Sequence, residues 1–217
     1  PLSTPYPSTT RYRSQDIQAL GIGCFGPIDL NRKSETYGYI TTTPKLAWKN
    51  YNIVGAFADA LDIPVGFDTD VNGSALGEAT WGITKGLDNS IYITIGAGVG
   101  MGIISNGKLL HGMLHPEGGH VLLTRHPKDT YGGKCPYHSN CLEGLAAGPA
   151  IEARWGKKGI ELADKKEVWE LEAYYIGQAL VDCIMLLSPQ RIVLGGGVMH
   201  QEHMMPLVRE EIGRAHV

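Results

Sequence analysis

Two thiols and two imidazoles lie close together in the second half of the chain. The run Cys135-Pro-Tyr-His138-Ser-Asn-Cys141 places three of them at equal spacing, and His120 lies upstream. These are the number and softness of ligands that a closed tetrahedral zinc site takes. Four unrelated side chains in a loop are the alternative, but the compact C-x2-H-x2-C spacing is typical of metal sites. We therefore predict a structural zinc site.

Two carboxylates flank these ligands in the sequence. Glu117 opens the run Glu117-Gly-Gly-His120, and Glu143 follows shortly after Cys141. Carboxylates accept hydrogen bonds from hydroxyl groups. A metal site that also holds acidic side chains in place therefore suggests a scaffold for binding a polar substrate.

Glycines alternate with other residues between Thr94 and Gly102. Without side chains, backbone N–H groups can approach phosphate oxygens, and successive amides can form an anion-binding nest. A hairpin rather than a helix follows this run, so it is not the dinucleotide-binding fingerprint of a Rossmann fold. A glycine-rich turn that only lets two sheets approach each other explains the pattern equally well, and both interpretations stay open.

Two further features have both a structural and a functional interpretation. The run Gly195-Gly196-Gly197 follows a predicted strand and fits either a nucleotide contact or a strand-to-helix turn. Asp70 lies at the end of another predicted strand, with Asn72 just after it. Asp70 could cap a helix, or it could act as a general base that accepts a proton from a sugar hydroxyl. Taken alone, the position favours the cap.

The elements that must position these residues alternate along the chain. Apolar runs bounded by turn residues predict strands at 17–22, 62–67, 90–95 and 191–194. Helical spacing of apolar residues predicts helices at 52–61, 71–81, 142–155 and 166–187. Asn106-Gly107 predicts a two-residue hairpin turn, and Pro189 is expected to end the last helix. Strands that alternate with helices indicate an α/β fold.

Composition sets broad bounds on size, partners and compartment. The 217 residues, 43% of them hydrophobic, can bury a core in one large domain or two small lobes. The net charge of -3, without a basic block, argues against nucleic acid as a partner. Without an apolar run of membrane-spanning length or a secretory leader, we expect a cytoplasmic protein with no membrane contact. Four cysteines, two of them assigned to the metal, argue against a disulfide framework.

In combination, the motifs resemble one known family, the ROK sugar kinases, over residues 14–209. The resemblance rests on Glu117-Gly-Gly-His120, the alternating glycines, and the Cys/His cluster that ends in Cys141-Leu-Glu143. Within the family, the chain is similar to the bacterial fructokinase branch at 43–48, 69–72 and 135–141. The resemblance implies a two-lobed α/β fold of the actin-like ATPase (ribonuclease H-like) class. It also implies ATP-dependent phosphorylation of a hexose, D-fructose to fructose 6-phosphate.

The resemblance further implies a role for each candidate residue. Asp70 is expected to be the general base that activates the 6-hydroxyl for in-line attack on the γ-phosphate of ATP. The residues expected to hydrogen-bond the sugar are Glu117, His120, Glu143 and Asn72. The residues expected to contact the nucleotide are Gly96, Ala97, Gly98, Gly100, Gly195, Gly196 and Gly197. The expected cofactors are Mg²⁺ with ATP and a structural Zn²⁺ held by His120, Cys135, His138 and Cys141.

His120 is expected to have two partners, with one ring nitrogen on zinc and the other on the sugar. The metal would then fix the tautomer and orientation of the ring. A homodimer is the assembly that the resemblance implies.

Several features depart from the family pattern. Position 97 is Ala where the family usually has Thr, and the family's N-terminal D-x-G-G-T-K element is not found in the chain. We therefore expect a fold truncated at both ends, with a partial N-terminal lobe at 14–88 and a partial C-terminal lobe at 89–211 that contains the zinc loop at 120–141. Residues 212–217 resemble translated sequencing adapter. The active kinase is then expected to be the parent protein, and this chain alone is expected to be inactive.

Two other functions remain open at the level of sequence. The family also contains sugar-sensing transcriptional repressors, which need a DNA-binding segment ahead of the sugar lobe. A zinc-stabilised sugar-binding module without turnover is the third possibility. The presence of Asp70 and of the alternating glycines favours the kinase.

Overall fold

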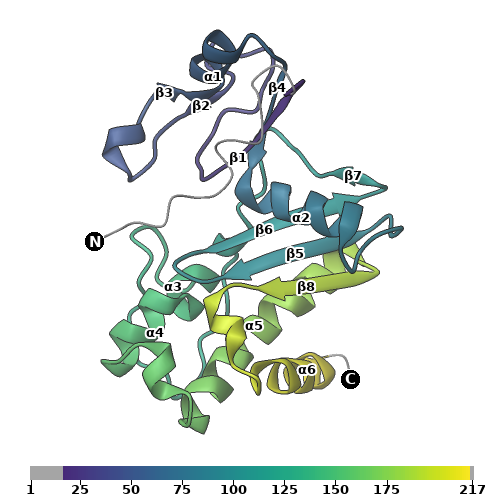
Figure 1. Ribbon diagram of the computed structural model, residues 1–217. Helices are drawn as coiled ribbons and strands as arrows, with labels where there is room; N and C mark the ends of the chain where they lie inside the picture. Colours follow the sequence, from purple (N-terminus) through teal and green to yellow (C-terminus); the bar gives the residue numbers. More distant parts are fainter. Residues whose placement is uncertain (1–16, 216–217) are drawn as a thin grey trace, which may run out of the picture. The chain divides into compact units, whose positions relative to one another are not determined.

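Strands and helices are interspersed along the chain (Figure 1), which confirms the predicted α/β class. The computed structural model describes residues 17–215. The strands are β1 (Leu20–Cys24), β2 (Tyr39–Ile40), β3 (Tyr51–Asn52), β4 (Val65–Thr69), β5 (Ser90–Ile95), β6 (Val99–Ser105), β7 (Lys108–Leu109) and β8 (Arg191–Gly195). The α-helices are α1 (Ile53–Leu61), α2 (Asp70–Trp81), α3 (Leu142–Ala146), α4 (Gly148–Trp155), α5 (Lys166–Leu187) and α6 (Met204–Ala215).

Two compact units divide inside α2, between Gly73 and Ser74. This division lies earlier than the lobe boundary that we predicted after residue 88. The first turn of α2 belongs with the first unit because it packs on β1, where a Cβ on Gly73 would lie 3.9 Å from the Cα of Gly23.

The proposed adapter segment at 212–217 falls partly outside the described residues, which end at 215. Helix α6 runs through residue 215, and the side chain of Ile212 packs against the core of the second unit. The first residues of the N-terminal lobe predicted at 14–88 also precede the described part of the chain.

In the first unit, β1 and β4 form a parallel pair in which Cys24 lies opposite Thr69. The small core of this unit contains Cys24, Ile28 and Ile40. The first strand begins and ends later than the predicted 17–22, because its extent follows its pairing with β4 and not the apolar run alone. Strand β4 leads directly into α2, so Asp70 lies at the carboxyl end of a parallel strand pair.

The second unit contains a four-stranded sheet in the order β7-β6-β5-β8. Strand β5 pairs antiparallel with β6 and parallel with β8. Asn106 and Gly107 have φ values of 51° and 73°, as a type I′ turn requires, so the predicted hairpin between β6 and β7 is confirmed. Ile91, Ile93 and Ile95 alternate along β5 and are buried, the pattern of a strand with one face on a core.

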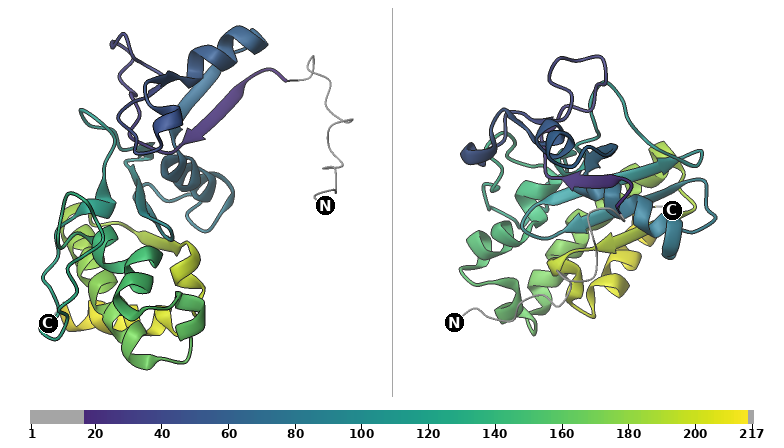
Figure 2. Two further views of the ribbon diagram at one scale, coloured as in Figure 1. Left: turned by 90° about the vertical axis from the view of Figure 1, so that its left-hand side faces the viewer. Right: turned by 45° about the horizontal axis from the view of Figure 1, so that its top comes forward.

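Helices α3 to α6 pack with this sheet around one apolar core (Figure 2). Helix α5 ends as predicted, with Ser188 in the left-handed region at φ 45° immediately before Pro189. Although α5 has 22 residues, none of the helices within residues 17–215 combines the length and apolar character that a membrane crossing requires.

The segment predicted as a single helix at 142–155 forms two helices, so this prediction was wrong. Ala147 separates α3 from α4 in an extended conformation, with φ −69° and ψ 156°. Pro149 lies in the first turn of α4, where its missing N–H is not needed. The N–H of Gly148 donates to the carbonyl of Gly96 at 2.7 Å. The break therefore brings the start of α4 to the glycine-rich turn between β5 and β6.

Candidate functional site

The four predicted metal ligands come together in the second unit. The ligand atoms of His120, Cys135, His138 and Cys141 all lie within 4.8 Å of one another. Sγ of Cys135 is 3.8 Å from Nδ1 of His120 and 3.6 Å from Nδ1 of His138. In a tetrahedral site with ordinary zinc–sulfur and zinc–nitrogen bonds, a sulfur and a nitrogen lie about 3.6 Å apart. The donor set and its spacing therefore fit one tetrahedrally bound metal ion.

Helix α3 holds one thiol of this cluster in place. Cys141 is the N-cap of α3, and its sulfur accepts a hydrogen bond from the N–H of Gly144 at 3.4 Å. A Cβ on Gly144 would lie 3.1 Å from the backbone nitrogen of Cys135, so glycine lets the two cysteines approach. Burial raises the pKa of the Cys141 thiol to about 11. A bound cation would oppose this shift, because it favours the thiolate.

Arg125, which was not predicted from the sequence, holds together the backbone of the segment 131–139 around Cys135. Its guanidinium donates to the carbonyls of Tyr131 and Ser139 and, at 3.0 Å, to the carbonyl of Gly132. These acceptors lie on both sides of Cys135 in the sequence. A planar group with several donors suits this task, because each bond fixes another backbone segment. Only a three-dimensional view could have identified it, since carbonyl partners leave no signal in the sequence.

His120 faces two kinds of partner with its two ring nitrogens. Nδ1 lies 3.6 Å from Sγ of Cys141, on the metal side. Nε2 lies 4.0 Å from Oε1 of Glu143. A hydroxyl group at ordinary hydrogen-bond distance, about 2.8 Å, from both atoms would fit between them. It could accept from the imidazole N–H and donate to the carboxylate.

Glu143 is anchored on the strand that follows the glycine-rich turn. Its Oε2 accepts a hydrogen bond from the N–H of Val99 at 3.0 Å. A Cβ on Gly98 would lie 2.8 Å from the same oxygen, closer than such contacts normally come. Gly98 is therefore needed to make room for a carboxylate, a role that the phosphate interpretation of the loop did not include.

The glycines of Glu117-Gly-Gly-His120 also have a packing role on β6. A Cβ on Gly119 would lie 2.1 Å from the carbonyl oxygen of Val99, a backbone atom that cannot easily move away. A Cβ on Gly118 would collide with the side chain of Met101. The motif is thus pressed onto β6, and this contact fixes where its two polar ends lie.

Glu117 has a partner that sequence reasoning also missed. Nε2 of His115 lies 2.9 Å from Oε1 of Glu117. The His115 hydrogen bond lowers the pKa of Glu117 despite its partial burial, and the nearby His120 acts in the same direction. The available signal was the position of His115 two residues before Glu117.

The structure brings the two predicted nucleotide segments together. Gly195 pairs with Thr94 across β8 and β5, and a Cβ on Gly96 would lie 3.7 Å from the backbone nitrogen of Gly197. Gly196 has a φ of 90°, and a Cβ there would lie 2.4 Å from the carbonyl oxygen of Ile95. Backbone groups of both segments are therefore neighbours at the carboxyl ends of the parallel strands β5 and β8.

Within the turn itself, the N–H of Gly96 donates to the carbonyl of Gly98 at 2.8 Å. Ala97, at the tip, is exposed, and Gly100 follows on β6 opposite Thr94. The turn is thus a tight hairpin tip with no side chain larger than a methyl group.

In the first unit, the residue that caps α2 is Thr69 and not Asp70, which the sequence favoured. Oγ1 of Thr69 accepts from the N–H of Asn72 at 3.1 Å, so Thr69 caps α2. Asp70 is the first residue of α2; its carboxylate is exposed and accepts from the N–H of Val71 at 2.8 Å. Asn72 is 1% exposed and donates to Asp68 at 2.7 Å. The cap interpretation of Asp70 is therefore wrong, and the base interpretation stays a prediction.

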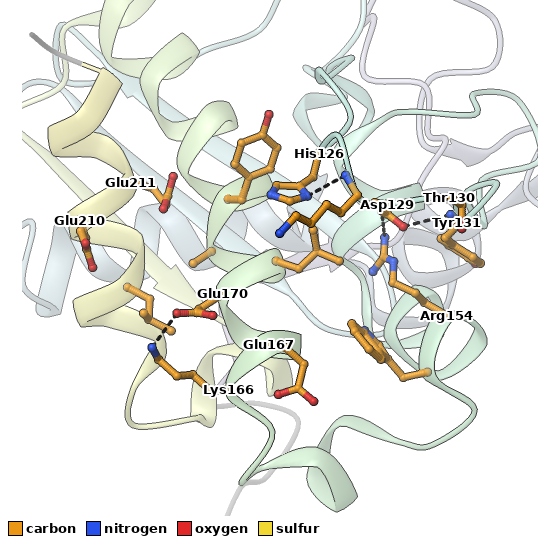
Figure 3. Close-up of a pocket in the computed structure, with 16 residues that line it drawn as sticks. His126, Asp129, Thr130, Tyr131, Arg154, Lys166, Glu167, Glu170, Glu210 and Glu211 are labelled. Atoms are coloured by element: carbon orange, nitrogen blue, oxygen red, sulfur yellow. Dashed lines mark hydrogen bonds and ion pairs between the residues drawn. The ribbon is translucent and has the colours of Figure 1, made fainter.

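A cavity of about 1130 Å³ in the second unit contains none of the predicted site residues (Figure 3). It is lined by the segment 126–131 and by α4, α5 and α6. At its edge Arg154 contacts Asp129 at 3.2 Å and Glu172 at 3.1 Å, and it donates to the carbonyl of Leu145 at 2.8 Å. Through these bonds, the buried side chain of Arg154 links α4 and α5 to α3, which carries Glu143.

Comparison with known proteins places the chain among sugar kinases. The sequence profile of the ROK family matches residues 8–216. A Bacillus subtilis (strain 168) relative is 54% identical over 203 residues, which are 93% of this chain and 68% of the relative. A fructokinase of Lactococcus lactis subsp. cremoris is 47% identical over 202 residues, 92% of this chain and 68% of the relative.

More distant relatives have other names. A glucokinase of Halalkalibacterium halodurans is 29% identical, over 84% of this chain and 62% of the relative. A xylose repressor of Bacillus spizizenii is 28% identical, over 94% of this chain and 55% of the relative.

Solved structures confirm the predicted fold class. The ROK hexokinase of Thermus thermophilus has a TM-score of 0.74 and 28% identity, covering 91% of this chain and 68% of that one. A ROK family glucokinase of Streptomyces griseus, solved with glucose and AMPPNP, has a TM-score of 0.71 and 26% identity, covering 92% of this chain and 72% of that one. The α/β fold is thus the actin-like ATPase fold of these kinases. With a family profile over nearly its whole length and relatives at 47% and 54% identity, the chain belongs to the ROK family.

Proposed function

We propose that this protein is an ATP-dependent fructokinase that converts D-fructose to fructose 6-phosphate. The observation that carries the proposal is a difference in identity within one family. The chain is 47% identical to the fructokinase of Lactococcus lactis but only 29% identical to the glucokinase of Halalkalibacterium halodurans. The geometry of the second unit supports it, because both candidate groups meet at β6. Glu143 accepts from Val99 at the start of this strand, the Glu117-Gly-Gly-His120 motif packs on it, and the candidate nucleotide residue Gly100 lies on it.

Sugar binding rests on Glu117, His120 and Glu143. These side chains offer carboxylate acceptors and an imidazole nitrogen, which suit the hydroxyl groups of a hexose. The distance of 4.0 Å between Nε2 of His120 and Oε1 of Glu143 leaves room for one hydroxyl. Asn72 is also proposed to contact the sugar. Its side chain is buried and donates to Asp68 at 2.7 Å, a bond that holds the segment before Asp70.

Nucleotide binding rests on backbone groups of the two neighbouring glycine segments. Gly96, Gly98 and Gly100 approach the phosphates, with the methyl group of Ala97 at the tip, while Gly195 to Gly197 approach the adenosine. Such a site needs little side-chain chemistry, since amide groups near a chain reversal attract phosphate oxygens.

The chemical step transfers one phosphoryl group. The oxygen of the 6-hydroxyl forms a bond to the γ-phosphorus, the bond from that phosphorus to the β,γ-bridging oxygen breaks, and ADP leaves. The carboxylate of Asp70 accepts the hydroxyl proton as general base. Mg²⁺ bound with ATP supplies neutralisation of the phosphate charge.

The metal on His120, Cys135, His138 and Cys141 is proposed to be zinc with a structural role. All four tetrahedral positions are taken by protein ligands, so no open position remains for an activated water. The metal then holds Nδ1 of His120 and leaves Nε2 for the sugar. We further propose that the protein acts in the cytoplasm as a homodimer, as the family resemblance implies.

The other two functions have weaker support. The xylose repressor of Bacillus spizizenii is 28% identical to this chain, well below the fructokinase of Lactococcus lactis. A binding module without turnover would not need a carboxylate at position 70, which is exposed at the end of β4.

The test is an assay of the complete gene product with MgATP against a panel of hexoses. We expect phosphorylation of fructose with a higher kcat/KM than for glucose or mannose. Asp70→Asn should lower kcat by about 10²- to 10⁴-fold, the range for loss of a general base, with the sugar still bound. Asp59→Asn, at an exposed acid on α1, is the matched control. Full activity of Asp70→Asn, or sugar binding without turnover in the wild type, would contradict the proposal.

A further inference from the structure

His115 is a buried polar side chain beside the candidate sugar site. Its side chain is 6% exposed, whereas that of Glu117 is 55% exposed. The 2.9 Å contact between Nε2 of His115 and Oε1 of Glu117 therefore joins a ring fixed by packing to a carboxylate that faces solvent. A surface glutamate without such a partner would sample several rotamers.

The direction of this hydrogen bond follows from the partners. An ionised carboxylate only accepts hydrogen bonds, and the contact itself lowers the pKa of Glu117. Nε2 must therefore carry the proton. Nδ1 of His115 is buried and has no hydrogen-bond partner among residues 17–215. The ring thus makes one directed bond within the described structure, and that bond goes to Glu117.

The bond occupies only one oxygen of Glu117. Oε2 makes no hydrogen bond within the described residues, so it can accept from a hydroxyl group of a ligand. Glu117 stands at the start of the motif that Gly118 and Gly119 press onto β6. The backbone of Glu117 is therefore fixed by packing. Its exposed side chain is not, so a hydrogen-bond partner is needed to hold the carboxylate in one orientation.

We propose that His115 is a positioning residue that holds the carboxylate of Glu117 in its sugar-binding orientation before the sugar arrives. The inference rests on the proposed function, because it requires that Glu117 bind the sugar. A pre-ordered carboxylate loses less side-chain freedom on binding, so the benefit lies in sugar affinity. His115 does not touch the reacting atoms, and the phosphoryl transfer step itself does not depend on it.

A pair of amide substitutions tests this in the full-length protein. The side-chain nitrogen of glutamine can take the place of Nε2, whereas that of asparagine falls nearer to Nδ1. His115→Gln should therefore keep the fructose KM within about 3-fold of wild type, and His115→Asn and His115→Phe should raise it about 5- to 20-fold. The kcat and the KM for MgATP should stay within about 2-fold in all three. Met113→Leu, at a 90% exposed position of the same loop, is the control and should change nothing.

Two further measurements separate positioning from a general loss of structure. Bound metal per chain and the melting temperature should be the same in His115→Asn and His115→Gln. Long-range nitrogen–proton correlation spectra of the wild type should find the proton on Nε2 of His115. Equal fructose KM values for the Gln and Asn variants, or a bare Nε2, would overturn the proposal.

If the proposed fructokinase function itself were wrong, the experimental result would differ from a failure of the His115 proposal. In that case the wild type itself would neither bind nor phosphorylate fructose, whatever stands at position 115. A wild type that phosphorylates fructose, with an unchanged KM in His115→Asn and His115→Phe, would overturn the role of His115 alone.

Discussion

The carboxylate of Glu143 accepts a hydrogen bond from the backbone N–H of Val99 at 3.0 Å. This single contact joins a residue beside the metal cluster to the first residue after the glycine-rich turn. Gly98 makes it possible, because any larger residue would place a Cβ 2.8 Å from the accepting oxygen.

Gly98→Ala should therefore lower activity without unfolding the protein. The end of the Glu143 side chain can move away, so the strain is relieved, but the bond to Val99 is lost and the carboxylate leaves its place beside His120. We expect kcat/KM for fructose to fall by about 10- to 100-fold, which corresponds to roughly 1.4–2.7 kcal/mol. Steady-state kinetics and thermal unfolding check this.

Gly77→Ala is the control for that substitution. Gly77 lies in α2, and a Cβ there would meet no atom within 4 Å. Alanine at an open helical position should leave kinetics unchanged and stabilise the fold by roughly 0.5–1 kcal/mol. If Gly98→Ala behaves like Gly77→Ala, Glu143 does not depend on its contact with Val99.

Removal of the metal should weaken sugar binding more than nucleotide binding. Without a cation on Nδ1, the His120 ring loses the partner that fixes its orientation toward Glu143. Cys135→Ser, or treatment with a strong chelator, should raise the fructose KM about 10- to 100-fold, the usual effect of disturbing the surroundings of a metal site. Metal analysis should find one zinc per chain in the wild type.

Cys24→Ala provides a comparison for the lost thiol, because Cys24 is buried in the core of the first unit. This variant should keep its zinc and its fructose KM. A Cys135→Ser protein that lacks zinc yet has a normal fructose KM would show that the metal and the sugar site are independent.

Arg125 should matter for metal retention rather than for catalysis. Its guanidinium bridges carbonyls of Tyr131, Gly132 and Ser139, on both sides of Cys135. Arg125→Lys keeps the charge but cannot reach all three acceptors, so it should release zinc to a competing chelator at least about 10-fold faster than the wild type. Lys128→Arg, in the same segment, should retain zinc as the wild type does. Equal release rates for Arg125→Lys and wild type would refute this role.

Stability should depend on pH through Glu172. Burial raises the pKa of this carboxyl to about 8, although Arg154 opposes the shift, and its ordinary value is 4.5. Between these values the folded state binds more protons than the unfolded state, so the free energy of unfolding should fall as the pH rises from about 5 to about 8. Urea unfolding at several pH values measures the slope.

Glu172→Gln should reduce this slope, since glutamine keeps an acceptor for Arg154 and has no proton to lose. Glu170→Gln, at a more exposed position of the same helix, should keep the wild-type slope. An unchanged slope in Glu172→Gln would mean that other groups set the pH dependence.

Sequence patterns correctly predicted those features that depend on interactions between residues close together in the chain. The clustering of His120, Cys135, His138 and Cys141 was predicted from cysteine and histidine spacing. The hairpin at Asn106-Gly107 was predicted from the positive φ that both residues tolerate. The prediction of a single helix at 142–155 was wrong because it passed over a local signal, Gly148-Pro149, since proline is tolerated in the first turn of a helix but not in its interior. The hydrogen bond from Gly148 to Gly96, which fixes where α4 begins, joins residues far apart in the sequence and could not be predicted from neighbouring residues.

The same reason explains which site residues were missed. His115 and Arg125 act through contacts with an exposed carboxylate and with backbone carbonyls, and neither leaves a recognisable spacing. The glycine pattern in the sequence indicated that position 98 must lack a side chain. It could not show whether the space is needed for a phosphate group or for the side chain of Glu143. Thr69, and not Asp70, caps α2 because the backbone geometry at the end of β4 decides which oxygen reaches the amide.

Val99 is held from two sides, by Glu143 at its N–H and by Gly119 against its carbonyl oxygen. A small displacement of the hairpin tip on a nucleotide phosphate would therefore shift two sugar-binding elements at once. The free energies of binding for the two substrates are then linked, and linkage is reciprocal: whatever factor MgATP applies to the sugar dissociation constant, the sugar applies to that of MgATP. The backbone of one valine would set the size of this heterotropic coupling.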